Sequence, residues 1–350
     1  MKRMFLKFAH YFIDKAKKSA YIRSFFDSRI KVEKLERFGE FKDSFNNTFE
    51  LRKGLRSIIK PGWENMYKDK MFDVSSDCLN QTAYNGKLAV NEMVPLINAF
   101  GKKIAGSTIL EIGCHAGATA FSFAEKGGKE VFASEFTEYK VESIDSESVT
   151  KNKLVSVSEE LTFLRNQLSI RYKEKDRVRF VEDDICNSTL PKNYFDIISS
   201  WQVLEHLHQP KKAFENIASL LKDDGIAIHA YNPFFCINGG HSLCTLDFLW
   251  GHVRLNEQDF TRYIEQIRPQ EKEKALAFYQ KGLNRMSIED LKKYCAEAHL
   301  KILSLLFFHD KHNIKNLDYD ILSQCQRNYP TLSFDDLITP IIILIVKKSS

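Results

Sequence analysis

Acidic and histidine side chains follow several apolar segments of the chain, where ligand binding and group transfer are often placed. Glu111 and the turn Gly113-Cys114-His115-Ala116-Gly117 close the apolar stretch at residues 108–112. A glycine directly after a buried strand permits a tight turn, and the free N–H groups of the next helix can face a ligand. Taken alone, a Gly-x-x-x-Gly pattern also fits simple helix packing.

Further acids stand at the ends of the next two predicted strands. Glu135 follows the stretch 131–134, and Asp183-Asp184 follows the stretch 178–181. A carboxylate in the first position can accept both hydroxyls of a ribose, and one in the second can meet an exocyclic amine. Each acid alone could be a helix N-cap or an exposed loop residue. Three acids at successive strand ends predict a nucleoside site.

A dinucleotide site is disfavoured by the same turn. Its fingerprint requires Gly-x-Gly-x-x-Gly, but His115 and Ala118 stand at the second and third glycine positions. The pattern fits a ligand with one nucleoside and no pyrophosphate better.

Strands and helices must alternate to bring these residues together. Apolar stretches that predict strands lie at 108–112, 131–134, 178–181, 195–200, 226–230, 301–308 and 337–347. Helical patterns separate most of them, with Ser287 as the N-cap of one. This alternation predicts an α/β fold with right-handed crossovers and a mostly parallel sheet that helices cover on both faces.

The chain resembles the class I S-adenosylmethionine-dependent methyltransferases, in particular those that modify small molecules. The resemblance covers about 90–230 and, more loosely, 287–347, through ILEIGCHAGATA, Glu135, FVEDDI, YFDIISSWQVLEHLHQP and LLKDDGIAIH. It implies S-adenosylmethionine as cofactor and a Rossmann-like, seven-stranded sheet.

The resemblance also implies roles for individual residues. Gly113 and Gly117, with Cys114 and His115 between them, match the turn that holds the methionine part, and Glu111 matches its leading acid. Glu135 matches the ribose acid, Asp184 the acid near the adenine amine, and Ile185 its apolar neighbour. Ser200, Trp201 and Gln202 match the segment beneath the cofactor. Since His115 replaces the usual middle glycine, we expect an altered loop shape.

Two regions lie outside this pattern. Residues 1–89 are predicted as a helical N-terminal extension, and residues 90–350 as the methyltransferase domain. Residues 233–285 interrupt the alternation and are predicted to form a lid over the acceptor. The aromatic side chains of this lid either line an acceptor pocket or form its own core: Phe234, Phe235, Phe248, Trp250 and Tyr263.

A hydroxyl acceptor usually needs a base of near-neutral pKa, and histidine is the natural choice. We favour His241, which follows two glycines, and then His229 near the carboxyl end of its strand. His252 competes with them, whereas His206 reads as structural. The predicted function is methyl transfer to a hydroxyl or amine of a small molecule or sugar. An RNA methyltransferase and a catalytically silent, cofactor-binding partner protein are the alternatives.

Composition restricts the partners. The net charge of +5, from 51 basic and 46 acidic residues in 350, argues against DNA and makes other nucleic acid unexpected. Seven cysteines without a Cys-x-x-Cys pair predict neither disulfides nor a metal site, and suggest the cytoplasm. Residues 1–26 fit a basic amphipathic helix, packed on its own domain or resting weakly on an anionic membrane. No feature specifies an oligomeric state.

Overall fold

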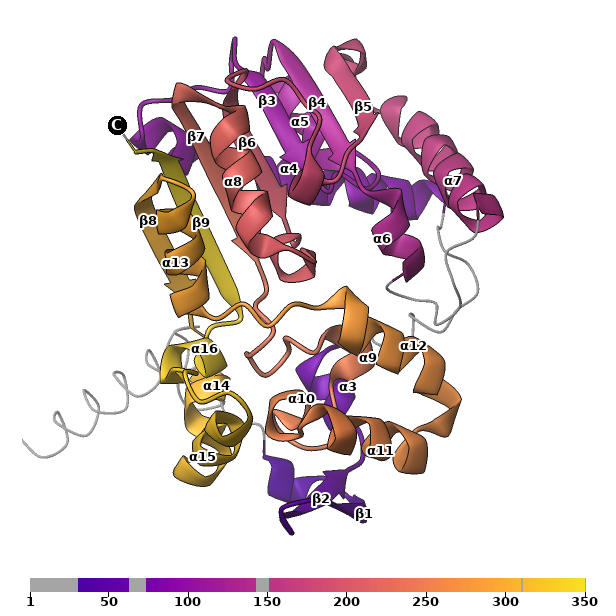
Figure 1. The fold of residues 1–350 in the computed structure, drawn as a ribbon. Coiled ribbons are helices and arrows are strands. Elements are labelled where there is room, and N and C mark those ends of the chain that lie inside the picture. Colours follow the sequence, from indigo (N-terminus) through magenta and orange to yellow (C-terminus); the bar gives the residue numbers. More distant parts are fainter. Residues whose placement is uncertain (1–30, 63–73, 143–150, 310, 350) are drawn as a thin grey trace, which may run out of the picture.

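The centre of the protein is a seven-stranded sheet in the order β5-β4-β3-β6-β7-β9-β8 (Figure 1). It is seen in a computed structural model that describes residues 31–62, 74–142, 151–309 and 311–349. The neighbouring pairs from β5 to β7 are parallel, and β9 is antiparallel to both of its neighbours. The strands are β3 (Thr108–Ile112), β4 (Glu130–Glu135), β5 (Val178–Glu182), β6 (Phe195–Trp201), β7 (Leu221–Tyr231), β8 (Leu300–Phe308) and β9 (Ile341–Lys348). The predicted α/β class and mostly parallel sheet are confirmed.

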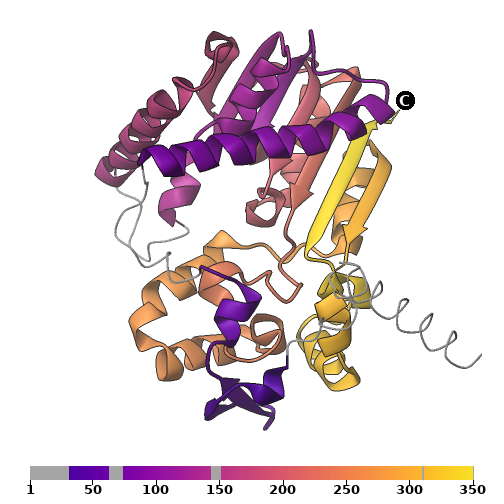
Figure 2. The same ribbon diagram turned by 180° about the vertical axis from the view of Figure 1, so that it is seen from behind.

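Helices cover both faces of this sheet. All five residues of β3 are buried, as expected for a strand with two covered faces. Ile109 packs with residues of α4 (Ser76–Ala99) and α5 (Ala118–Glu125), and α4 crosses one face of the sheet in Figure 2. Leu110 points the opposite way and packs with α8 (Pro210–Leu220) and α13 (Ile288–Glu297). Period-two alternation therefore divides one strand between two cores.

The connections place helix starts at the carboxyl ends of the strands. Helices α6 (Thr137–Glu142) and α7 (Lys151–Ser169) join β4 to β5, and short 3-10 turns occur at η3 (Lys175–Arg177), η4 (Ile185–Asn187) and η5 (Leu204–His206).

The Ser287 hydroxyl accepts from the Asp290 N–H in a capping box at the start of α13, as the sequence predicted.

Three segments far apart in sequence form a second core below the carboxyl ends of the parallel strands (Figure 1). We call residues 32–59, 234–283 and 317–338 the cap. Phe49, Trp250 and Leu337 are all buried in this one core. The cap elements and the adjoining α14 are η1 (Val32–Lys34), β1 (Arg37–Lys42), β2 (Thr48–Arg52), α3 (Leu55–Ile59), α9 (His241–Cys244), α10 (Gly251–Arg254), α11 (Glu257–Ile267), η6 (Pro269–Glu271), α12 (Lys272–Ala277), the π-helix η7 (Phe278–Gly282), α14 (Lys311–Asn316), α15 (Tyr319–Asn328) and α16 (Phe334–Ile338). The predicted lid is thus packed against part of the N-terminal extension.

The N-terminal extension differs from the expected run of helices. β1 and β2 form an antiparallel hairpin, with Phe41 opposite Phe49. Phe49 and Leu51 are buried while Glu50 between them is exposed, which is the alternation of a half-buried strand. The expectation of helix was therefore wrong for residues 37–52. Helix α4 also begins at Ser76, well before the boundary placed at residue 90.

Two other expectations concern the chain termini. The last strand begins at Ile341 rather than at Leu337, because a capping box at Ser333 starts α16 and keeps Leu337 helical. The predicted basic helix of residues 1–26 lies outside the described residues. Among the residues that the structure describes, none of the helices has the length and apolar character needed to cross a membrane.

Candidate functional site

A pocket lies at the carboxyl ends of β3, β4, β5 and β6. The chain leaves β3 toward β4 on one side and returns to β6 on the other, so the pocket occupies a topological switch point. Six of the predicted cofactor residues line it: Gly113, His115, Glu135, Asp184, Ile185 and Gln202. The parallel sheet thus brings together residues that lie up to about ninety positions apart in the sequence.

The glycine turn after β3 has three residues in the left-handed region. The φ angles are 70° at Gly113, 48° at His115 and 81° at Gly117, which is the N-cap of α5. A Cβ at Gly113 would lie 2.5 Å from a Val203 methyl, and one at Gly117 2.5 Å from the Phe180 ring. Both glycines are therefore required by space and by backbone angle. The loop accommodates the unusual His115 by a left-handed conformation at that residue.

Two side chains hold this turn in place. Glu135 Oε2 accepts a 2.5 Å hydrogen bond from the His115 backbone N–H. Arg165 of α7 donates from Nε to the His115 carbonyl oxygen at 2.9 Å, and its guanidinium lies 4.5 Å from the centre of the Phe180 ring. The backbone of the turn is thus fixed from both sides, and the Glu135 carboxylate is brought to the pocket wall.

The two acids after β5 have different environments. Asp183 Oδ1 accepts from the Thr189 N–H at 2.9 Å, which closes the local loop. Asp184 Oδ1 accepts from the Cys186 N–H at 2.9 Å, and its Oδ2 lies 3.7 Å from His208 Nε2. Both acids reach the pocket lining beside Ile185.

Glu111 is buried under the turn rather than in the pocket wall. Burial raises the pKa of its carboxyl to about 8, and the nearby Glu135 adds to this, whereas hydrogen bonds from Thr119 and the Ala120 backbone lower it. Its Oε2 has no hydrogen-bond partner among the described residues. Burial disfavours the charged form of this carboxyl, so a cation bound at the adjacent loop would lower its pKa and stabilise the carboxylate.

The other predicted cofactor residues lie behind the pocket lining. Cys114 is buried, and its N–H donates to the Ser134 carbonyl oxygen at 2.8 Å. Ser200 is buried and its hydroxyl lies 2.8 Å from His229 Nδ1. Trp201 packs partly against the core of α4 and α5. These residues support the segment that ends in Gln202, which has a φ of 58° and lines the pocket.

The two predicted catalytic histidines are both removed from the pocket surface. His229 is fully buried, and burial lowers its pKa to about 3. His241 begins α9, and burial holds its pKa well below the usual value, with smaller effects from His206 and Lys60. The His241 ring centre lies 5.1 Å from that of His206, which does line the pocket.

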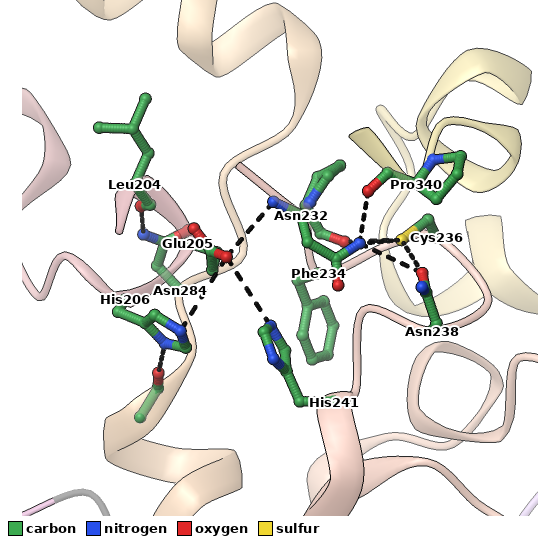
Figure 3. Close-up of polar contacts among 12 residues, drawn as sticks. Leu204, Glu205, His206, Asn232, Phe234, Cys236, Asn238, His241, Asn284 and Pro340 are labelled. Atoms are coloured by element: carbon green, nitrogen blue, oxygen red, sulfur yellow. Dashed lines mark hydrogen bonds and ion pairs between the residues drawn. The ribbon is translucent and has the colours of Figure 1, made fainter. Parts of the chain in front are cut away.

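Glu205, His206 and His241 form a cluster beside the pocket (Figure 3). The Nε2 atoms of both histidines lie 4.0 Å from Glu205 Oε1. Burial raises the pKa of Glu205 to about 8 and lowers that of His206 to about 4, while Lys60 lowers both. The sequence predicts a structural role for His206 and no role for Glu205. The signal that could have found them is their adjacency in the segment that follows β6.

The cap contributes little apolar surface to the pocket. The five aromatic side chains proposed for the lid are each 4% exposed or less and belong to the cap core. Of the two alternatives, they form the core of the cap. The cap meets the pocket through its backbone instead: the Gly282 carbonyl oxygen accepts from Tyr139 Oη at 2.8 Å and lies 2.7 Å from His206 Nδ1.

Comparison with known protein families gives an extended match. A family described as "Methyltransferase domain" matches residues 84–305, more than half of the 350-residue chain. No curated protein matches the chain at a significant level.

Solved structures with similar arrangements have low identity. An S-adenosylmethionine dependent methyltransferase from Mesorhizobium loti is 9% identical with a TM-score of 0.41, covering 73% of this chain and 97% of that chain. Magnesium protoporphyrin IX methyltransferase from Synechocystis PCC 6803, with bound SAH, is 15% identical with a TM-score of 0.40, covering 82% and 93% respectively.

Proposed function

The chain belongs to the methyltransferase-domain family, and from this premise we propose that it methylates a hydroxyl or amine of a small molecule. S-adenosylmethionine is the methyl donor. The observation that carries the proposal is the convergence of Gly113, Glu135 and Asp184 on one pocket. They come from three different strand ends.

The residues of this pocket suit the parts of the cofactor. We propose that the Gly113–Gly117 turn, with Cys114 and His115, receives the methionine part, and that Glu111 beneath it loses its proton when the cation binds and then offsets the positive charge. Glu135 would accept the ribose hydroxyls, and Asp184 the adenine amine. Ile185 supplies an apolar surface for the ring, and Ser200, Trp201 and Gln202 form the floor.

The acceptor side is proposed to be the part of the pocket next to the cap. Tyr139, His206 and His208 line it with polar groups, and Val203 and Leu207 are apolar. This mixture can orient one hydroxyl or amine of a compact substrate. His241 stands directly behind His206, so we propose that the two histidines act together on the acceptor. His229, bonded to Ser200, supports the floor.

The protein contributes position to a reaction for which the sulfonium already activates the methyl group. When bound, S-adenosylmethionine would supply the methyl group and leave as S-adenosylhomocysteine, a neutral thioether. The acceptor oxygen or nitrogen would bond to the methyl carbon as the carbon–sulfur bond breaks, and the acceptor's proton would pass to water. Holding the three atoms in line supplies much of the rate.

Calorimetric titration with S-adenosylmethionine and S-adenosylhomocysteine tests the cofactor assignment. We expect one site per chain, weakened in Gly113→Val, whose added branches meet Val203. Lack of binding of either compound to the folded full chain would contradict the proposal.

The acceptor class is tested separately with methyl-labelled cofactor. Full-length protein is incubated with a panel of small hydroxyl and amine compounds and, in a parallel arm, with RNA. Label transferred to a small molecule supports the proposal. Label found only in RNA would replace it with the other enzymatic alternative.

A further inference from the structure

The cluster of Glu205, His206 and His241 has three potential metal-binding atoms directed at one another. No two of these atoms are more than 4.8 Å apart, and Glu205 Oε1 is 4.0 Å from each histidine Nε2. Figure 3 shows both imidazoles pointing at the same carboxylate. The cluster joins the end of η5 in the sheet domain to the first residue of α9 in the cap.

Buried atoms in this cluster lack protein partners. Glu205 is 1% exposed, and its Oε1 accepts a long hydrogen bond, 3.3 Å, from the Asn232 N–H. Its Oε2 and His241 Nε2 are both buried without a hydrogen-bond partner in the described part of the chain. Orphaned buried polar atoms of this kind call for an ion or a water.

The spacing fits an ion better than direct contact between the side chains. With two of the three separations at 4.0 Å and the third at most 4.8 Å, a point equidistant from the three atoms lies no more than about 2.5 Å from each. Imidazole and carboxylate distances to zinc are about 2.0–2.2 Å, so inward shifts of a few tenths of an ångström complete the contact. Two imidazoles and a carboxylate leave further coordination positions open.

The surroundings of His206 also match those of a metal ligand. Its Nδ1 lies 2.7 Å from the Gly282 carbonyl oxygen, which can only accept, so Nδ1 carries the proton. The Nε2 lone pair is left facing Glu205. Metal-binding histidines commonly donate their other N–H to a carbonyl in this manner, which fixes the tautomer and the ring.

We propose that Glu205, His206 and His241 bind a divalent transition-metal ion at the acceptor edge of the pocket. Imidazole with carboxylate suits zinc, cobalt, manganese or iron(II) rather than calcium. The Glu205 charge partly offsets that of the ion. Lys60 opposes binding of the ion, because its positive charge acts on all three ligands.

The site implies a narrower acceptor class, and this part rests on the proposed methyl transfer. His206 belongs both to the cluster and to the pocket lining, so the open coordination face is reached from the pocket. A hydroxyl oxygen bound there releases its proton to water more readily, as metal-bound water does. The oxygen then bonds to the methyl carbon while the carbon–sulfur bond breaks. The substrate would be a compact molecule with a metal-binding hydroxyl.

The probe is Co²⁺, added to full-length protein that has been stripped with a chelator and dialysed. We expect one equivalent to bind and to produce visible d–d absorption. Glu205→Gln keeps the side-chain shape without the charge, and His241→Asn suits the left-handed φ of 51° at that position. Both variants should weaken Co²⁺ binding at least tenfold. Lys60→Met should strengthen it.

Two further histidine variants serve as controls. His309→Asn removes an exposed histidine and should leave the Co²⁺ spectrum unchanged. His208→Asn tests a second three-ligand group among the described residues, Asp184, Cys186 and His208, and should also leave the Co²⁺ spectrum unchanged. Circular dichroism and urea unfolding of each variant establish that it is folded.

The outcomes separate the two proposals. Wild-type protein that binds S-adenosylmethionine but no Co²⁺ would overturn the metal site alone. The same holds if Glu205→Gln binds Co²⁺ normally, or if His208→Asn abolishes binding instead. Absence of S-adenosylmethionine binding with Co²⁺ binding intact would overturn the cofactor assignment and leave the metal site standing.

Discussion

The hydroxyl of Tyr139 lies 2.8 Å from the carbonyl oxygen of Gly282 and donates a hydrogen bond to it. Tyr139 lines the pocket from α6, and Gly282 ends the π-helix η7 of the cap. π-Helical turns are frequent at functional sites, and this one ends at the residue that contacts the pocket lining. The Gly282 carbonyl oxygen therefore connects the cap to two residues of the pocket lining, Tyr139 and His206, whose Nδ1 lies 2.7 Å from it.

Removal of the Tyr139 hydroxyl should loosen this connection. A net hydrogen bond contributes about 1 kcal/mol, so Tyr139→Phe should raise KM for the acceptor roughly fivefold and speed amide exchange in residues 278–284. Tyr194→Phe is the matched control, because its hydroxyl bonds Glu130 at 2.8 Å outside the pocket. Equal rates of amide exchange in the two variants would show that the Tyr139 hydroxyl does not hold the cap.

Glu135 should be the carboxylate on which cofactor affinity depends most. It reaches the pocket and binds the backbone of the glycine turn. Charge-assisted hydrogen bonds contribute about 1.5–3 kcal/mol, so Glu135→Gln should weaken S-adenosylmethionine binding by roughly 10- to 100-fold in calorimetry. Glu130 lies at the other end of β4, so Glu130→Gln should bind S-adenosylmethionine normally. A change below twofold in Glu135→Gln would exclude the role.

The sheet and the pocket could be predicted from the sequence because short-range patterns encode them. Continuous apolar runs marked the strands, and Gly113, Glu135 and Asp184 stood directly at their ends. Parallel strands bring such ends to one edge of a sheet without further information. The position of His115 was also informative, since its side chain is accommodated by a left-handed backbone.

The cap could not be predicted in the same way, because its core is assembled from three distant segments. Phe49, Trp250 and Leu337 share that core, and no local pattern connects them. The hairpin did carry a signal, the alternation of Phe49, Glu50 and Leu51, which was outweighed by the helical character expected of its neighbours. The Glu205–His241 contact depends on how the cap packs against the sheet domain, so it could not be predicted from the sequence either.

A buried ion pair connects the N-terminal part of the cap to its helices. Arg56 donates to both carboxylate oxygens of Glu271 at 3.0 Å, and Arg268 lies 3.0 Å from the same carboxylate. Arg56→Ala removes the arginine that binds both oxygens of this buried carboxylate, which costs about 3–5 kcal/mol. Urea unfolding should show this loss. Arg37→Ala, which breaks only exposed pairs, should cost less than about 1 kcal/mol, and similar losses would contradict the assignment.

Glu111 should make stability depend on pH. Burial raises its pKa in the folded chain to about 8, above the ordinary value of 4.5, so the folded state holds a proton that the unfolded state releases between these values. Its contribution to stability therefore falls as pH rises through that window.

Glu111→Gln removes this proton-linked loss while it keeps the side-chain shape. Its stability relative to wild type should increase between pH 5.5 and pH 8.5 by a few kcal/mol at most, since one pKa unit corresponds to about 1.4 kcal/mol. Urea unfolding without cofactor at both pH values measures the difference. Glu289→Gln, on the exposed first turn of α13, is the control and should show the same offset at both. A pH-independent offset for Glu111→Gln would show that its carboxylate is ionised in the folded protein throughout.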